Sequence, residues 1–233
     1  LKHAPEMLFS RSFQTQNRDV CDNEILPWLR QWKGMQTEPT TAHYFCRWLA
    51  DLGVLRRVYT QNIDGLHTKG GLLPDAMVVE AHGSLHKDNV VLYEDALPPR
   101  FYECLRQDFP RSNLNREGYV GPDLVVVMGT SLQVAPFCAV PNLGPPSAVR
   151  VLISLDTAEC LQNGFSKSAQ HIWETGLSAN DAVRCTSVRL AGRLVTLRPR
   201  WLDRKAKWEQ YLVNGEADAF CALCMANGPV ACC

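Results

Sequence analysis

The sequence lacks the features that mark several classes of protein. No uninterrupted apolar run approaches the roughly 18 residues that a membrane-spanning helix needs. The opening residues lack the apolar core of a secretory signal, and because the chain begins with Leu1 rather than Met we expect its natural start to lie upstream. The formal net charge is zero, from 24 Lys and Arg against 24 Asp and Glu, so no overall positive charge favours nucleic-acid binding. From these absences we expect the protein to bind neither a membrane nor a nucleic acid.

The sequence also lacks paired cysteine motifs, although it contains 10 cysteines. Only the C-terminal Cys221 and Cys224 have Cys-x-x-Cys spacing, and a second pair with its own ligand turn is missing. We therefore expect no metal site formed by the cysteines of this chain. Six others are singly spaced, mostly in apolar surroundings, as is typical of reduced thiols in a nuclear or cytoplasmic protein: Cys21, Cys46, Cys104, Cys138, Cys160 and Cys185.

The chain is 46% hydrophobic, which is enough to form a sizeable core. Leu124–Met128 is an uninterrupted apolar run and implies a strand that is covered on both faces. The alternation of strands and helices along the chain predicts an α/β fold, a Rossmann-like parallel sheet with helices on both faces. We expect helices at 37–52 and 98–109, and strands at 54–60, 76–84, 89–94, 123–132, 148–156 and 171–176.

Three of the predicted strands end in polar turns: TQNIDG at 60–65, AHGS at 81–84 and GTSL at 129–132. Ligands of parallel sheets bind beyond the carboxyl ends of the strands, so these turns should point into one crevice. Each turn also has a simpler explanation: an Asx-turn, a histidine bonded to a neighbouring carbonyl, and a tight Gly-Thr-Ser turn. No single motif decides between site and turn, but the combination suits a ligand with a phosphate, sugar hydroxyls and a carboxamide.

The motifs TQNIDGLH, EAHGS, GPDLVVVMGTSLQVAPF and RVLISLD occur in this order, and together they resemble the sirtuin family of NAD-dependent protein deacylases. NVVLYEDALPPRF also resembles the family segment that lines the peptide cleft. The resemblance covers residues 1–157, which we interpret as a sirtuin-like NAD-binding catalytic core. Residues 158–192 match weakly as the end of that core, and 193–233 are an extension of unknown role.

The resemblance implies an enzyme that uses NAD to remove the acyl group from a lysine of a protein substrate, a histone or another protein. The acyl group passes to ADP-ribose, and nicotinamide is released. His82 would be the general base that activates a ribose hydroxyl, while Asn62 and Asp64 would hold the nicotinamide carboxamide and a nearby water. The implied cofactor-binding residues are Gln61, Asn62, Ile63, Asp64, Gly129, Thr130, Ser131, Ser154 and Asp156, and the implied substrate-binding residues are Val91, Tyr93 and Val134.

The sequence departs from the family in four places. The family's Gly-Ala-Gly loop would precede Leu1, and its zinc module would fall between Lys87 and Asp88. The zinc expected from the family therefore has no ligand cysteines in this chain, although we expect the natural protein to contain both segments. Glu94 replaces a glycine, where its carboxylate could crowd a peptide, and Ser154 replaces an asparagine. These departures leave two alternatives open: a non-catalytic module that binds NAD or ADP-ribose, and a protein ADP-ribosyltransferase.

Overall fold

The computed structural model describes residues 5–35, 37–110, 121–145 and 148–154, the single residues Cys160, Gln162 and Phe165, and the backbone of two further strands at 172–175 and 230–232. Its strands are β1 (Leu55–Thr60), β2 (Val78–Glu80), β3 (Leu124–Met128), β4 (Val149–Ile153), β5 (Ile172–Thr175) and β6 (Val230–Cys232). Its helices are α1 (Pro5–Leu8), α2 (Arg11–Gln16), α3 (Arg18–Val20), α4 (Leu26–Gly34), α5 (Thr41–Asp51) and α6 (Pro99–Asp108).

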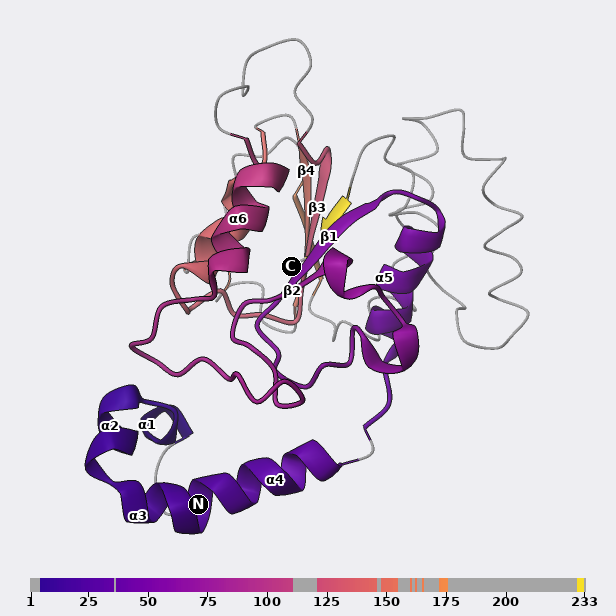
Figure 1. The fold of residues 1–233 in the computed structure, drawn as a ribbon. Coiled ribbons are helices and arrows are strands. Elements are labelled where there is room, and N and C mark those ends of the chain that lie inside the picture. Colours follow the sequence, from indigo (N-terminus) through magenta and orange to yellow (C-terminus); the bar gives the residue numbers. More distant parts are fainter. Residues whose placement is uncertain are drawn as a thin grey trace, which may run out of the picture.

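The strands form one sheet in the order β2-β1-β6-β3-β4-β5, and every neighbouring pair is parallel. Helices α5 and α6 pack on opposite faces of this sheet, while α1 to α4 lie beyond one end of it (Figure 1). The predicted Rossmann-like α/β fold is confirmed.

Alternating side chains of each central strand enter two different cores. Val126 packs with Phe45, Trp48 and Leu49 of α5 on one face. Its neighbours Val125 and Val127 pack with Phe101 of α6 on the other face. Each fully buried side chain of this size contributes about 1.5–3 kcal/mol through removal of apolar surface from water. Burial on both faces is the physical reason for the apolar run in β3.

Most of the predicted helices and strands are present but shorter than predicted. The prediction of a strand at 89–94 was wrong. This segment makes only an isolated bridge between Tyr93 and Ser10. The Val91 N–H donates to the carbonyl of His82 at 2.9 Å, and Tyr93 bonds the backbone of the α1–α2 region. The segment has the apolar, β-branched composition of a strand, yet in the described part of the chain it has no long neighbouring strand to pair with.

Strand β6 occupies a central position in the sheet, although Val230–Cys232 lies in the extension whose role the sequence left open. It pairs with Leu55, Arg57 and Val58 of β1 on one side. On the other side it pairs with Leu124–Val126 of β3. A segment from the far end of the sequence therefore joins the two halves of the sheet.

A buried carboxylate joins α6 to β1. Asp108, at the end of α6, has no solvent exposure and receives hydrogen bonds from Arg56 Nε at 2.9 Å and from the Tyr59 hydroxyl at 2.6 Å. Arg57 also forms an ion pair with it. Burial and the hydrogen bond to Asp108 raise the pKa of Tyr59, so the phenol stays protonated and donates. Two arginines within a buried strand are thus explained by their shared partner.

We expect Asp108→Ala to lower the free energy of unfolding by about 3–5 kcal/mol, because Arg57 and the Tyr59 hydroxyl would lose their buried partner. Tyr59→Phe removes one hydrogen bond to the carboxylate and should cost only about 1.5–3 kcal/mol. Urea denaturation of both variants measures the difference. An Asp108→Ala variant no less stable than Tyr59→Phe would contradict a central role for this carboxylate.

Candidate active site: a crevice and a cleft with a common wall

Among the described residues, β1 and β3 leave a gap between their carboxyl ends. Val58 of β1 and Val126 of β3 both lie opposite Cys232. Beyond this level β1 continues to Thr60 and β3 to Met128, and in the described residues no strand lies between them. A crevice at the carboxyl ends of parallel strands is the usual ligand site of such sheets.

The turn after β1 forms one side of this gap. The Asn62 N–H donates to the Thr60 hydroxyl at 3.1 Å, and the Leu66 N–H donates to Asp64 Oδ1 at 3.0 Å. The second bond is an Asx-turn, so the simpler explanation of Asp64 holds for one of its oxygens. The side-chain amide of Asn62 makes no hydrogen bond with the described residues and is available to a ligand.

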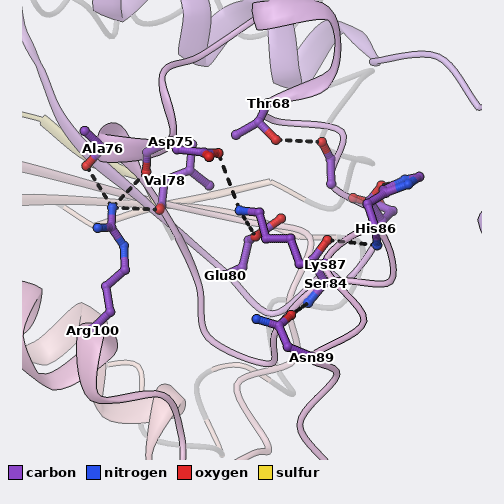
Figure 2. Close-up of polar contacts among 12 residues, drawn as sticks. Thr68, Asp75, Ala76, Val78, Glu80, Ser84, His86, Lys87, Asn89 and Arg100 are labelled. Atoms are coloured by element: carbon purple, nitrogen blue, oxygen red, sulfur yellow. Dashed lines mark hydrogen bonds and ion pairs between the residues drawn. The ribbon is translucent and has the colours of Figure 1, made fainter.

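The turn after β2 positions His82. The Ala81 N–H donates to the carbonyl of Thr60 at 2.9 Å, which places His82 beside the turn after β1. Gly83 has φ of 74°, and a Cβ there would lie 2.0 Å from the carbonyl oxygen of Asn89, so only glycine suits this turn. Figure 2 shows Asn89 bonded to Ser84 and Lys87 bonded to Glu80 at 2.8 Å, which tie the loop to the end of β2.

The turn after β3 completes the gap. Gly129 has φ of 61° and donates its N–H to the carbonyl of Ile153 at 2.9 Å. The Thr130 hydroxyl donates to Gln61 Oε1 at 2.9 Å across the end of β6. The turns after β1 and β3 are therefore in direct contact, as the sequence predicted.

Two cavities share one wall at these turns. The first, called the crevice, has a volume of about 490 Å³, and its lining includes Gln61, Asn62, His82, Gly129, Thr130 and Ser131. The second, called the cleft, has a volume of about 430 Å³ and runs along Val90–Asp95. Gln61, Asn62, His82, Tyr93 and Val134 line both. A group held in the crevice and a group held in the cleft would meet at this wall.

His82 is a neutral base at physiological pH. Burial lowers its pKa below the usual value of 6.5, and a hydrogen bond to the backbone of Gln61 opposes this only partly. Its ring lies 6.4 Å from that of Phe137, which shields one side. A half-buried neutral imidazole at the junction of two cavities has the properties of a general base.

A second pair of imidazoles lines the crevice. The rings of His43 and His67 lie 4.5 Å apart, and both belong to the crevice wall. His43 Nδ1 accepts from the Thr40 N–H at 3.1 Å, so the proton of the neutral ring is on Nε2. That Nε2 and Nδ1 of His67 are buried without a hydrogen-bond partner among the described residues. Unsatisfied polar atoms of this kind suit a polar ligand.

The crevice fits a sugar-containing ligand better than a highly charged one. Hydroxyls, amides and the two free imidazole nitrogens can bond ribose hydroxyls and a carboxamide. The described residues of the lining include no Lys or Arg, so among them a phosphate would depend on backbone N–H groups such as those after Gly129.

The structure brings together most of the predicted site residues. Ile63, Asp64 and Val91 line the cleft but not the crevice. Ser154 is buried after β4 and lines neither cavity, and Asp156 lies outside the described residues. The sequence did not predict His43 or the cleft residue Trp32 as site residues, because each reaches the site from a helix and carries no motif of its own.

The comparisons with known proteins agree with this geometry. The model of the Sir2 family matches residues 2–95, which include the turns that carry Asn62 and His82. Over part of its length the chain is similar to the sirtuins.

Named sirtuin relatives are NAD-dependent protein deacetylases. The chain is 30% identical over 158 residues to NAD-dependent protein deacetylase sirtuin-2 of Danio rerio, covering 52% of this chain and 39% of the relative. It is 33% identical over 161 residues to NAD-dependent protein deacetylase SIR2rp1 of Leishmania major, covering 54% and 40%. For NAD-dependent protein deacetylase hst2 of Schizosaccharomyces pombe the identity is 32% over 155 residues, covering 52% and 43%. The chain thus spans about two fifths of these relatives.

The described residues contain no group of three or more His, Cys, Asp or Glu side chains arranged to hold a metal ion. None of the helices described is long and apolar enough to cross a membrane. Cys221 and Cys224 lie outside the described residues.

His43 makes the stability of the protein depend on pH. Burial, and then the neighbouring His67, lower its pKa from 6.5 to about 4, while Asp64 acts in the opposite direction. The unfolded chain therefore binds a proton more readily. The neutral His43 ring contributes roughly 2–3 kcal/mol to the free energy of unfolding above pH 6.5. This contribution is lost as the pH falls toward 4.

We expect His43→Gln to flatten the fall in unfolding free energy between pH 7 and pH 4. Glutamine can still accept from the Thr40 N–H and so preserves the capping box of α5. Urea denaturation at a series of pH values measures this slope. His86→Gln, at an exposed histidine, is the matched control and should leave the slope unchanged. Equal slopes in all three proteins would contradict the assignment.

Proposed function

We propose that this chain forms the core of an NAD-dependent protein-lysine deacylase, most simply a deacetylase. The observation that carries the proposal is the common wall of the crevice and the cleft, where Asn62 and His82 lie. An acyl-transfer reaction between a dinucleotide and a lysine side chain needs two binding sites that meet at a base. The named activity of the relatives supports this assignment.

In this proposal NAD occupies the crevice, where it supplies a sugar–nicotinamide bond whose cleavage drives acyl transfer. The amide of Asn62 binds the nicotinamide carboxamide, with Asp64 holding a nearby water from the cleft side. Gln61 contacts the nicotinamide ribose, and its bond to Thr130 fixes its orientation. Gly129, Thr130 and Ser131 face the diphosphate and the adenosine ribose. Ile63, Ser154 and Asp156 remain predicted cofactor contacts on the resemblance alone.

The acyl-lysine enters the proposed site through the cleft. Val91 and Tyr93 flank one side and Val134 the other, and all three line that cavity. His82 would accept the proton of a ribose hydroxyl held at the common wall. The apolar side chains of Val91 and Val134 restrict water at this part of the cleft, which favours transfer of the acyl group to the sugar over hydrolysis.

The substrate is proposed to be a lysine of an intracellular protein, a histone or another. The domain limits at 157 and 192, and the zinc expected from the resemblance, also stay predictions. Analysis of metal in the purified protein tests the zinc expectation.

We expect His82→Ala to lower acyl transfer by about 10²–10⁴-fold, because the general base is lost. The variant should keep measurable affinity for NAD, since the other crevice residues are unchanged. Rates come from mass spectrometry of the acetyl-lysine peptide, and affinity from calorimetry with NAD. Unchanged turnover would remove His82 from the role of base.

The products distinguish the proposed activity from its alternatives. The protein is incubated with NAD and an acetyl-lysine peptide. O-acetyl-ADP-ribose with free nicotinamide supports deacylation, and ADP-ribose attached to protein supports transferase activity. Binding of NAD without turnover supports a non-catalytic module and overturns the proposal.

The pH dependence of kcat/KM provides a further test. Because the folded pKa of His82 is lowered, the imidazole is neutral at and above pH 6.5. The rate should therefore fall on the acid side with a midpoint below about 6.5. A midpoint above 7 would identify a different ionising group.

A further inference from the structure

The lining of the cleft has an unbalanced charge. Among the described residues it contains the carboxylates of Asp64, Glu94 and Asp95 and no Lys or Arg. Arg11 forms an ion pair with Asp95 and neutralises that one. Asp64 and Glu94 make no ion pair with the described residues, so the cleft carries about two uncompensated negative charges.

Glu94 is held in this position by specific contacts. Its backbone has φ of 78°, a left-handed conformation that costs a non-glycine residue roughly 1–2 kcal/mol. The carboxylate accepts hydrogen bonds from the Ser10 hydroxyl at 2.7 Å, the Ser12 hydroxyl at 2.8 Å and the Ser12 N–H at 3.0 Å. It is bound to the start of α2 and lines the cleft. These bonds, led by that from Ser10, lower the pKa of Glu94, so it remains charged.

Exposed aromatic rings accompany these carboxylates. Trp32 and Tyr93 both line the cleft, and each is 47% exposed. Trp32 packs against Trp28 with ring centroids 4.7 Å apart, and Trp28 packs against Phe9 at 5.9 Å. This row of rings fixes the face that Trp32 presents. Aromatic faces next to carboxylates favour cationic side chains, above all arginine.

We propose that the acidic, aromatic cleft selects acyl-lysine segments flanked by Lys or Arg, with Glu94 as a specificity-determining residue. The inference rests on the proposed function, since it names the substrate class of the same cleft. A cationic flanking residue gains attraction from Glu94 and Asp64 and can lie on the Trp32 ring. An acidic flanking residue meets like charge and has no basic partner in the lining.

Peptide binding to the full chain tests this without depending on turnover. Three fluorescent acetyl-lysine peptides differ only in flanking residues, with Arg, Ala or Glu on both sides. Fluorescence anisotropy should give an affinity order of Arg, then Ala, then Glu, with steps of roughly three- to tenfold. The Arg peptide should lose more affinity than the Ala peptide when salt rises from 50 to 500 mM.

Glu94→Gln keeps an oxygen for the serine hydroxyls but removes the charge. It should reduce the Arg-over-Ala preference by about threefold. Glu103→Gln removes an exposed carboxylate on α6, away from the cleft, and should leave the preference unchanged. The salt dependence of the unmutated chain provides the same test should Glu94→Gln fail to fold.

The outcomes separate this inference from the proposed function. Equal affinity for all three peptides, together with deacetylation of each, would overturn charge selection and leave the enzyme assignment intact. A preference that Glu94→Gln does not alter would remove Glu94 as its source. Binding of none of the peptides, with no deacetylation, would overturn the proposed function itself.

Discussion

The site depends on the parallel alignment of β1 and β3 on the two sides of β6. All three strands are parallel, and Cys232 lies opposite both Val58 and Val126. Strand β1 continues to Thr60 and β3 to Met128, and both of these residues line the crevice. The turns that follow are bridged by the bond from Thr130 to Gln61. A misaligned β3 would separate Thr130 from Gln61.

The sequence predicted those parts of the structure that local patterns determine. The apolar run of β3 indicated a strand covered on both faces, and the polar residues after three strands indicated where the turns would meet. The central place of β6 could not be predicted, because three residues near the C-terminus carry no period. Their position is set by pairing with β1 and β3, which are distant in the sequence. The segment 89–94 has strand-like composition, but the described residues include no long neighbouring strand with which it could pair. It forms a wall of the cleft instead.

The sequence likewise predicted some residues of the candidate site and missed others. His82 and Asn62 follow strands directly, so the direction of the strand also gives the direction of the turn. His43 and Trp32 belong to helices, and their approach to the cavities depends on how α5 and α4 pack. The sequence indicated that the Glu94 carboxylate could crowd a peptide, but it did not identify the partners of that carboxylate. The structure shows that Ser10 and Ser12 bind it.

The two cavities on either side of the common wall have different chemical linings. The crevice is lined by amides, hydroxyls and imidazoles, which suit an uncharged sugar. The cleft is lined by carboxylates and aromatic rings, which suit a cationic segment. A ligand suited to one cavity is therefore poorly suited to the other, so each should bind on its own side. His82 is neutral and half-buried between them, so it adds no charge to the site before it accepts a proton from a group held there.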